Sequence, residues 1–168
     1  MILVVGSTGQ LGREVCRQLA LQHRPVRALV RATTDPSKLE RLQRLGITSA
    51  PGDLRDASSL QAALRGIETV ICTASAMPFA YQANSNDIRS VDLEGVTRLV
   101  DQARAAGVRQ FIYTSFSGNL EVSSPLRDAK RSVERHLRAS GMAYTIRRPS
   151  YFMEVWLSPA VGFDVAGR

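Results

Sequence analysis

Two hydrophobic periods alternate along this chain from its first residues. Short, almost wholly apolar runs, such as residues 2–5 (Ile-Leu-Val-Val), are typical of parallel strands that are buried on both faces. Between these runs, apolar residues recur every four positions, as at Leu11, Val15 and Leu19, which is the spacing of a helix that covers a sheet. The expected strands are residues 2–5, 26–30, 48–50, 69–74, 110–114 and 143–147. The expected helices are residues 11–20, 36–45, 57–65, 85–106 and 125–140.

Residues with strong terminal preferences flank the expected helices. Asp35 and Asp56 are placed as N-caps, Pro36 fits a first helical position, and Gly46 and Gly66 follow the last turns. Strands that alternate with helices through short connections pair in parallel through right-handed crossovers. The sequence therefore predicts a doubly wound α/β sheet (the Rossmann fold) with the strand order 3-2-1-4-5-6.

A glycine-rich loop, residues 6–12 (Gly-Ser-Thr-Gly-Gln-Leu-Gly), joins the first strand to the first helix. Gly6 permits the tight turn, Gly9 lets the backbone approach a pyrophosphate, and Gly12 lets the helix pack closely on the strand. The helix then directs free N–H groups and the positive end of its dipole toward the phosphates. The loop therefore predicts a dinucleotide-binding site, with a plain turn as the simpler alternative.

The residue after the second strand indicates which dinucleotide is preferred. An acidic residue there accepts a hydrogen bond from the ribose 2′-hydroxyl of NAD, whereas an arginine accommodates the 2′-phosphate of NADP. This chain has Arg31, and no acidic residue follows until Asp35. A guanidinium pairs with phosphate through two hydrogen bonds, so NADP(H) is expected over NAD(H), unless Arg31 is an ordinary surface residue.

The glycine spacing G-x-x-G-x-x-G, with Thr8 before the second glycine, resembles that of the atypical short-chain dehydrogenase/reductases. Within that group the chain is most similar to the NmrA-like, isoflavone-reductase-like branch. Besides the glycine loop, the resemblance rests on residues 26–31 (VRALVR), 52–54 (GDL), 107–115 (GVRQFIYTS) and 140–149 (SGMAYTIRRP). It implies an NADPH-dependent reductase of a small enone, quinone or phenolic compound. The alternative is a redox sensor or scaffold that binds NADP without turnover, because NmrA-like proteins include such regulators.

The motif and the resemblance together define a set of candidate site residues. The cofactor is expected to contact Gly6, Ser7, Thr8, Gly9, Gln10, Leu11, Gly12, Arg31, Asp53, Leu54, Thr73, Ala74, Ser75, Ser115, Phe116, Lys130, Pro149, Tyr151 and Phe152. Residues 52–54 match the turn that holds adenine in the family. Phe116 falls near the position of the usual catalytic serine, so Ser115 or Ser117 is expected to supply a hydroxyl while Phe116 walls the nicotinamide pocket.

The usual Tyr-x-x-x-Lys pair of the family is incomplete in this chain. Lys130 stands at the lysine position, but Leu126 occupies the tyrosine position and cannot donate a proton. The resemblance implies that Lys130 binds the nicotinamide ribose and is the candidate catalytic residue, since in the isoflavone-reductase group the lysine is taken to assist proton transfer. The simpler alternative is that Lys130, with four arginines near it in the sequence, is one more solvated charge on a basic helix.

Composition changes this picture little. The 168 residues carry a net charge of +7, with 44% hydrophobic and 22% charged residues, as in a soluble globular domain. The basic balance permits nucleic-acid binding, but no zinc pattern, recognition helix or aromatic-interleaved basic patch accompanies it, so no nucleic-acid partner is expected. Cys16 and Cys72 are expected to be packing residues, His23 and His136 to face solvent, and no metal site or membrane segment is expected.

Two expectations concern the extent and location of the protein. Residues 1–150 are expected to form the NAD(P)-binding domain, and residues 151–168 to begin a substrate-facing lobe that is truncated. The aromatic cluster around residues 151–156 would then line the nicotinamide and substrate pocket. Because no secretory signal is seen, a cytoplasmic protein is expected. Neither the substrate nor the oligomeric state can be read from the sequence.

Overall fold

A computed structural model describes residues 1–76, 87–120, 122–150 and 152–153 of the chain. Within them, six parallel strands form one sheet with the order β3-β2-β1-β4-β5-β6, which confirms the predicted fold and strand order. The strands are β1 (Ile2–Val5), β2 (Val26–Val30), β3 (Thr48–Pro51), β4 (Thr69–Cys72), β5 (Gln110–Thr114) and β6 (Ala143–Arg147). The helices are α1 (Gln10–Leu21), α2 (Pro36–Arg44), α3 (Ala57–Ala63), the π-helical segment η2 (Ile88–Gly95), α4 (Val96–Ala105) and α5 (Pro125–Ala139).

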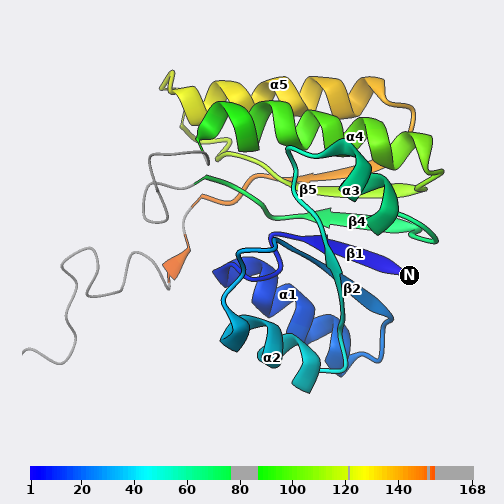
Figure 1. Cartoon of the computed structure of the whole chain (residues 1–168). Helices are drawn as coiled ribbons and strands as arrows, with labels where there is room; N and C mark the ends of the chain where they lie inside the picture. The colour runs from blue at the N-terminus through cyan, green and yellow to red at the C-terminus, as the bar shows by residue number, and fades with distance from the viewer. Residues whose placement is uncertain (77–86, 121, 151, 154–168) are drawn as a thin grey trace, which may run out of the picture.

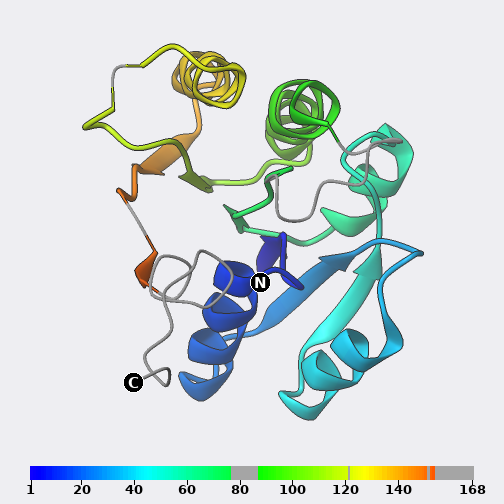
Figure 2. The same cartoon turned by 90° about the vertical axis from the view of Figure 1, so that its left-hand side faces the viewer.

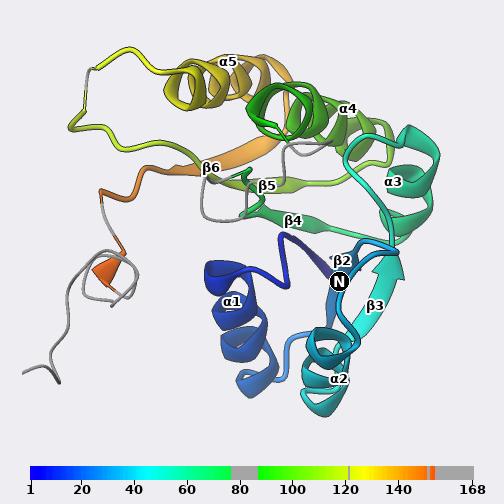
Figure 3. The same ribbon diagram turned by 60° about the vertical axis from the view of Figure 1, so that its left-hand side comes forward.

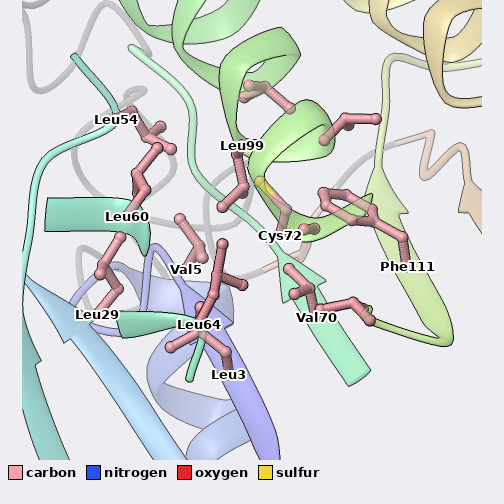
Figure 4. Packing of buried hydrophobic residues seen from close by; sticks show 14 of the residues in the cluster. Leu3, Val5, Leu29, Leu54, Leu60, Leu64, Val70, Cys72, Leu99 and Phe111 are labelled. Atoms are coloured by element: carbon pink, nitrogen blue, oxygen red, sulfur yellow. The ribbon is translucent and has the colours of Figure 1, made fainter. Parts of the chain in front are cut away.

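The sheet lies between two layers of helices (Figure 1). Helices α1 and α2 cover one face, and α3, α4 and α5 cover the other (Figure 3). Alternate strand residues point to opposite faces, so Leu3 and Val5 pack under α3 and α4, whereas Val4 packs toward α1 and α2. The larger of the two cores also contains Val70, Cys72, Leu99 and Phe111 (Figure 4). This packing on both faces explains why the central strand β1 reads as a continuous apolar run in the sequence.

The helix ends follow the local signals in the sequence. The Asp35 carboxylate accepts a hydrogen bond from the backbone N–H of Ser37 at 2.8 Å, and Asp56 caps Ser58 at 2.9 Å. Gly46 ends α2 with φ +70°, a backbone conformation that a residue with a Cβ adopts only with strain. The two predicted N-caps and this helix end are confirmed.

Several expected boundaries shift by one or two residues, as at α3, which ends at Ala63 instead of residue 65, and two differences bear on the site. Strand β4 ends at Cys72 instead of residue 74. Thr73 still donates its N–H to the Val5 carbonyl of β1, but beyond it the backbone bonds to side chains: Ala74 accepts from Lys130, and Ala76 donates to Asp92. The helix expected over residues 85–106 is π-helical over η2 before it continues as α4, and residues 85–86 lie outside the described part of the chain. Sequence periodicity cannot separate these helix types over one or two turns, and π-helical turns are frequent at functional sites.

Candidate functional site

The carboxyl ends of the parallel strands meet at one edge of the sheet, which Figure 2 shows from the side of that edge. Strand β1 lies between β2 and β4, so the strand order reverses beside it. Ligands of open α/β sheets bind at this switch point. Thr73 fixes the edge there, because its N–H and its hydroxyl both donate to the Val5 carbonyl, at 2.9 and 3.1 Å.

The glycine loop after β1 has three glycines in three different surroundings. Gly6 has φ +82°, which makes the sharp turn out of the strand. A Cβ on Gly12 would lie 2.1 Å from the Gly6 carbonyl oxygen. There is no room for a side chain at position 12, because the helix packs directly against the loop. Among the residues that the structure describes, a Cβ on Gly9 would meet only the Gly6 carbonyl oxygen within 4 Å, at 3.3 Å. Gly9 therefore leaves open space in front of the loop that any larger residue would fill.

Helix α1 begins without a side-chain cap. Its N-cap residue is Gly9, and no side chain makes a capping hydrogen bond there. Ser7 does not substitute, because its buried hydroxyl donates to the Leu29 carbonyl at 2.9 Å. Thr8 is half-buried and Gln10 is exposed. First-turn N–H groups without a capping side chain, together with the open face at Gly9, suit the pyrophosphate of a dinucleotide.

Charged residues also follow the next two strands of the sheet, β2 and β3. Arg31 follows β2 and is exposed, and β2 and β3 pair as far as Val30 and Pro51. Asp53 follows β3, and its carboxylate forms an ion pair with Arg55 at 2.7 Å. The Arg55 side chain donates hydrogen bonds to the Asp53 carboxylate and thereby lowers the pKa of Asp53. Leu54 is 7% exposed and belongs to the core, which leaves its side chain little surface for a ligand.

Lys130 is not a solvated charge, so the simpler alternative is wrong. It is 4% exposed and reaches from α5 to the carboxyl ends of two strands. Its ammonium group lies 3.2 Å from the Ala74 carbonyl oxygen and 3.3 Å from that of Thr114, and forms an ion pair with Asp92 at 3.1 Å. An ammonium has three protons, and the structure provides three acceptors for them. Lys130 thus joins β4, β5, η2 and α5 at the switch-point edge.

The nearby Tyr113 does not replace the missing tyrosine of the Tyr-x-x-x-Lys pair. The Lys130 ammonium lies 5.2 Å from the centre of the Tyr113 ring. Tyr113, however, is completely buried, and its hydroxyl has no hydrogen-bond partner among the described residues. Burial raises the pKa of Tyr113 further above its ordinary value. A phenol without solvent access cannot deliver a proton to a bound substrate.

Asp92 is a functional candidate that the sequence reading missed. It is 0% exposed, and besides Lys130 it accepts hydrogen bonds from the Ser75 hydroxyl at 2.7 Å and the Ala76 N–H at 2.8 Å. The signal was present in the sequence: an acid at position 92 shares the helical apolar stripe of Val96 and Leu99. A carboxylate on a buried stripe requires a partner, and here the partner is a lysine from another helix.

A second buried acid lies beside the end of β5. Glu134 on α5 is 1% exposed and accepts a hydrogen bond from the Ser115 hydroxyl at 2.6 Å. Arg131 bonds Glu134 at 2.6 Å, the Phe116 carbonyl at 3.1 Å and the Ser117 carbonyl at 2.7 Å. The Ser115 hydroxyl is therefore already bound, and Arg131 is not a simple solvated charge. Phe116 is half-buried, and its place in a nicotinamide pocket stays a prediction.

The remaining site candidates follow β6. Pro149 is half-buried, and Phe152 is 38% exposed. Tyr151, which was expected beside them, lies outside the described residues, as do most of residues 151–168, so the expected division into a domain and a further lobe stays a prediction. Arg148, just before Pro149, bonds the Glu134 carboxylate through both Nε and Nη2.

The other reactive side chains behave as structural groups. Both cysteines are buried, and burial raises the pKa of each thiol to about 11. His136 is partly exposed, as expected, and lies 2.7 Å from Asp101. In the described part of the chain no cluster of His, Cys, Asp or Glu is arranged to hold a metal ion. Nor does any helix described there combine the length and apolar character needed to cross a membrane.

Comparison with known proteins assigns the chain to a family. The NmrA-like family profile matches residues 1–165. An NAD(P)H azoreductase of Xenophilus azovorans is 34% identical over 156 residues, which cover 92% of this chain and 49% of that protein. An isoflavone reductase homolog of Zea mays is 35% identical over 173 residues, which cover 96% of this chain and 51% of the relative.

A solved structure agrees with these sequence matches. The NADPH-dependent quinone oxidoreductase QOR2 of Escherichia coli, in complex with NADPH, superposes with a TM-score of 0.74 at 28% identity, over 95% of this chain and 53% of that one. The chain thus spans about half the length of the relatives that it matches. The expected resemblance is confirmed, and the chain belongs to the NmrA-like family.

Proposed function

We propose that this chain binds NADP(H) at the switch-point edge and forms the nucleotide-binding part of an NADPH-dependent reductase of small enones, quinones or phenolic compounds. The observation that carries the proposal is the glycine loop, where helix α1 starts without a side-chain cap behind the open face of Gly9. Relatives named as an NAD(P)H azoreductase and an NADPH-dependent quinone oxidoreductase support the same chemistry.

The preference for NADP over NAD rests on Arg31. This exposed guanidinium stands at the carboxyl end of β2, where the ribose of the adenosine half lies in doubly wound folds. Asp53, which follows the neighbouring strand β3, pairs with Arg55 at 2.7 Å and also interacts electrostatically with Arg31. An exposed guanidinium at this position favours the 2′-phosphate, which it can bind through two charge-assisted hydrogen bonds.

NADPH, when bound, supplies the hydride, and the chain supplies binding and orientation. The first turn of α1 binds the pyrophosphate, and Arg31 binds the 2′-phosphate. Lys130 orients the ends of β4 and β5 and offers its ammonium group to the nicotinamide ribose. Both a hydrogen bond to the ribose and a proton transfer require the Lys130 ammonium to release one of its three present acceptors.

Binding is tested first, by calorimetric titration of the chain with NADPH and with NADH. Wild type is expected to prefer NADPH, and Arg31→Asp is expected to abolish that preference. Arg24→Asp is the matched control, because it makes the same change of charge at the other end of β2, and Arg24 is likewise exposed. Equal affinity of wild type for the two cofactors would contradict the role given to Arg31.

Turnover is tested separately, with NADPH oxidation followed in the presence of quinones, azo dyes and enones. Oxidation that depends on the added acceptor supports the reductase. Tight NADPH binding without oxidation across all three classes of acceptor would favour the non-catalytic sensor instead.

A further inference from the structure

The buried carboxylate of Glu134 bonds residues of the two segments that follow β5 and β6. Glu134 Oε1 accepts hydrogen bonds from Ser115 at 2.6 Å, from Arg131 at 2.6 Å and from Arg148 Nε at 2.9 Å, and Arg148 Nη2 bonds the second oxygen, Oε2. Arg138 adds a longer ion pair at 3.6 Å. Burial by itself raises the pKa of Glu134, but its hydrogen bonds from Arg148, Ser115 and Arg131 outweigh burial and lower it to about 2. The group is therefore a carboxylate near neutral pH.

Two of the partners of Glu134, Ser115 and Arg148, come from the two strand ends on one side of the switch point. Ser115 follows β5 directly, and its N–H donates to the Arg147 carbonyl of β6 at 2.7 Å. Arg131 extends the cluster to the carbonyls of Phe116 and Ser117. Arg148 also lies close to the loop after β5, since a Cβ on Gly118 would lie 3.7 Å from its Cδ.

This side of the edge is where the nicotinamide half belongs, if the proposed function is right. A dinucleotide crosses the switch point with one half on each side, and Arg31 places the adenosine half over β2. The other half then extends toward β4, β5 and β6. The loop of residues 115–118 and the segment that starts at Arg148 would border it, and both are tied to Glu134.

We infer that Glu134 is a positioning residue, which sets the relative placement of the loop after β5 and the segment after β6 around the nicotinamide end of the cofactor. It touches neither cofactor nor substrate and acts through Ser115, Arg131 and Arg148. This inference rests on the proposed function for its link to the cofactor, but the placement itself involves only residues of this chain.

The placement is tested in the free protein by amide hydrogen exchange of Glu134→Gln. The Ser115 N–H, which bonds the Arg147 carbonyl, and the Asn119 N–H, which bonds the Ser117 hydroxyl, are expected to exchange at least about tenfold faster, equivalent to about 1.4 kcal/mol. Amides of β1 and α1 are expected to keep their wild-type protection. Uniformly faster exchange across the sheet would mean general destabilisation and would overturn the inference.

Two further variants keep this test decisive. Arg148→Met removes one partner of Glu134. The Arg148 side chain is 38% exposed, so the fold should tolerate the change, and the same two amides are expected to lose protection to a smaller degree. Glu40→Gln is the matched control, since it breaks an exposed glutamate–arginine pair with Arg44 on α2 and should change neither amide. Unchanged protection in both Glu134→Gln and Arg148→Met would refute the positioning role.

The link to the cofactor is tested with two ligands that differ in the nicotinamide. Glu134→Gln is expected to weaken NADPH binding about tenfold, while the affinity for 2′-phospho-ADP-ribose, which lacks the nicotinamide, stays at the wild-type value. An equal loss for both ligands would contradict the inference. If wild type binds neither ligand, the proposed function fails by that result alone, and the exchange data still decide whether Glu134 positions the two segments.

Discussion

The buried pair of Lys130 and Asp92 gives the strongest test of how this edge is built. Their side chains are 6% and 0% exposed, and 3.1 Å separates the charged atoms. Lys130→Met keeps most of the side-chain volume but leaves the Asp92 carboxylate without its cation. Removing one partner of a buried ion pair costs about 3–5 kcal/mol. Asp92 retains hydrogen bonds from Ser75 and Ala76, so the lower end applies.

We therefore expect Lys130→Met to lower the free energy of unfolding by about 3 kcal/mol. In a chain of this size that loss shifts Tm downward by about 6–12 °C. The assay is urea unfolding followed by circular dichroism, with the m value compared between variants to confirm that the same surface is exposed. The double variant Lys130→Met/Asp92→Asn should regain about 1–2 kcal/mol, because asparagine carries no charge to bury. Its amide oxygen can still accept from the Ala76 N–H, and its NH2 group can donate to the Ser75 hydroxyl oxygen.

Arg89→Met is the matched control on the same π-helical segment. Arg89 pairs with Glu94 at 2.7 Å, but the two side chains are 82% and 47% exposed. Exposed pairs contribute about 0–1 kcal/mol, so this variant should unfold almost as wild type does. If Lys130→Met is no less stable than Arg89→Met, then the Lys130 ammonium is hydrated in solution and the account of the edge given above is wrong.

Other predictions concern the glycine loop, the cofactor and pH. Gly9→Val should fold but lose NADPH binding in calorimetry, because its side chain would occupy the open face of the loop; unchanged affinity in the folded variant would show that the loop is only a turn. Gly12→Ala, whose Cβ would lie 2.1 Å from the Gly6 carbonyl oxygen, should lower stability by about 1–3 kcal/mol or more in the same urea assay. Arg31→Asp should weaken NADPH binding by about 1.5–3 kcal/mol, roughly tenfold to hundredfold, with NADH as the reference ligand. The folded pKa of Glu134, about 2, lies below its ordinary 4.5, so its contribution to stability is complete above about pH 4.5 and is lost as pH falls toward 2; Glu134→Gln should flatten this part of the urea-derived pH profile.

Local sequence signals determined the sheet and the binding loop. The central strand β1 is a short apolar run, helices such as α1 have an apolar stripe, and residues such as Asp35 and Gly46 define helix ends within a few positions of the chain. Strand order then follows from alternation, because right-handed parallel crossovers leave few topologies. The glycine loop could be read for the same reason, because the nearest neighbour of both Gly9 and Gly12 is Gly6, within seven consecutive residues.

Only the tertiary structure decides which charged side chains are buried at the carboxyl ends of the strands and with which residues they pair. Lys130 meets Ala74 across 56 positions of sequence, and Ser75 meets Asp92 across 17. On α5, Lys130 and Glu134 share a face with Val133 and Leu137, so helical spacing marks both charges as candidates for burial but does not show what would pair with them. Burial of a charge depends on a partner brought by another element. Helical periodicity could have marked Asp92 and Glu134 as acids on apolar stripes, whereas only the packed sheet shows that Lys130, Arg131 and Arg148 are their partners.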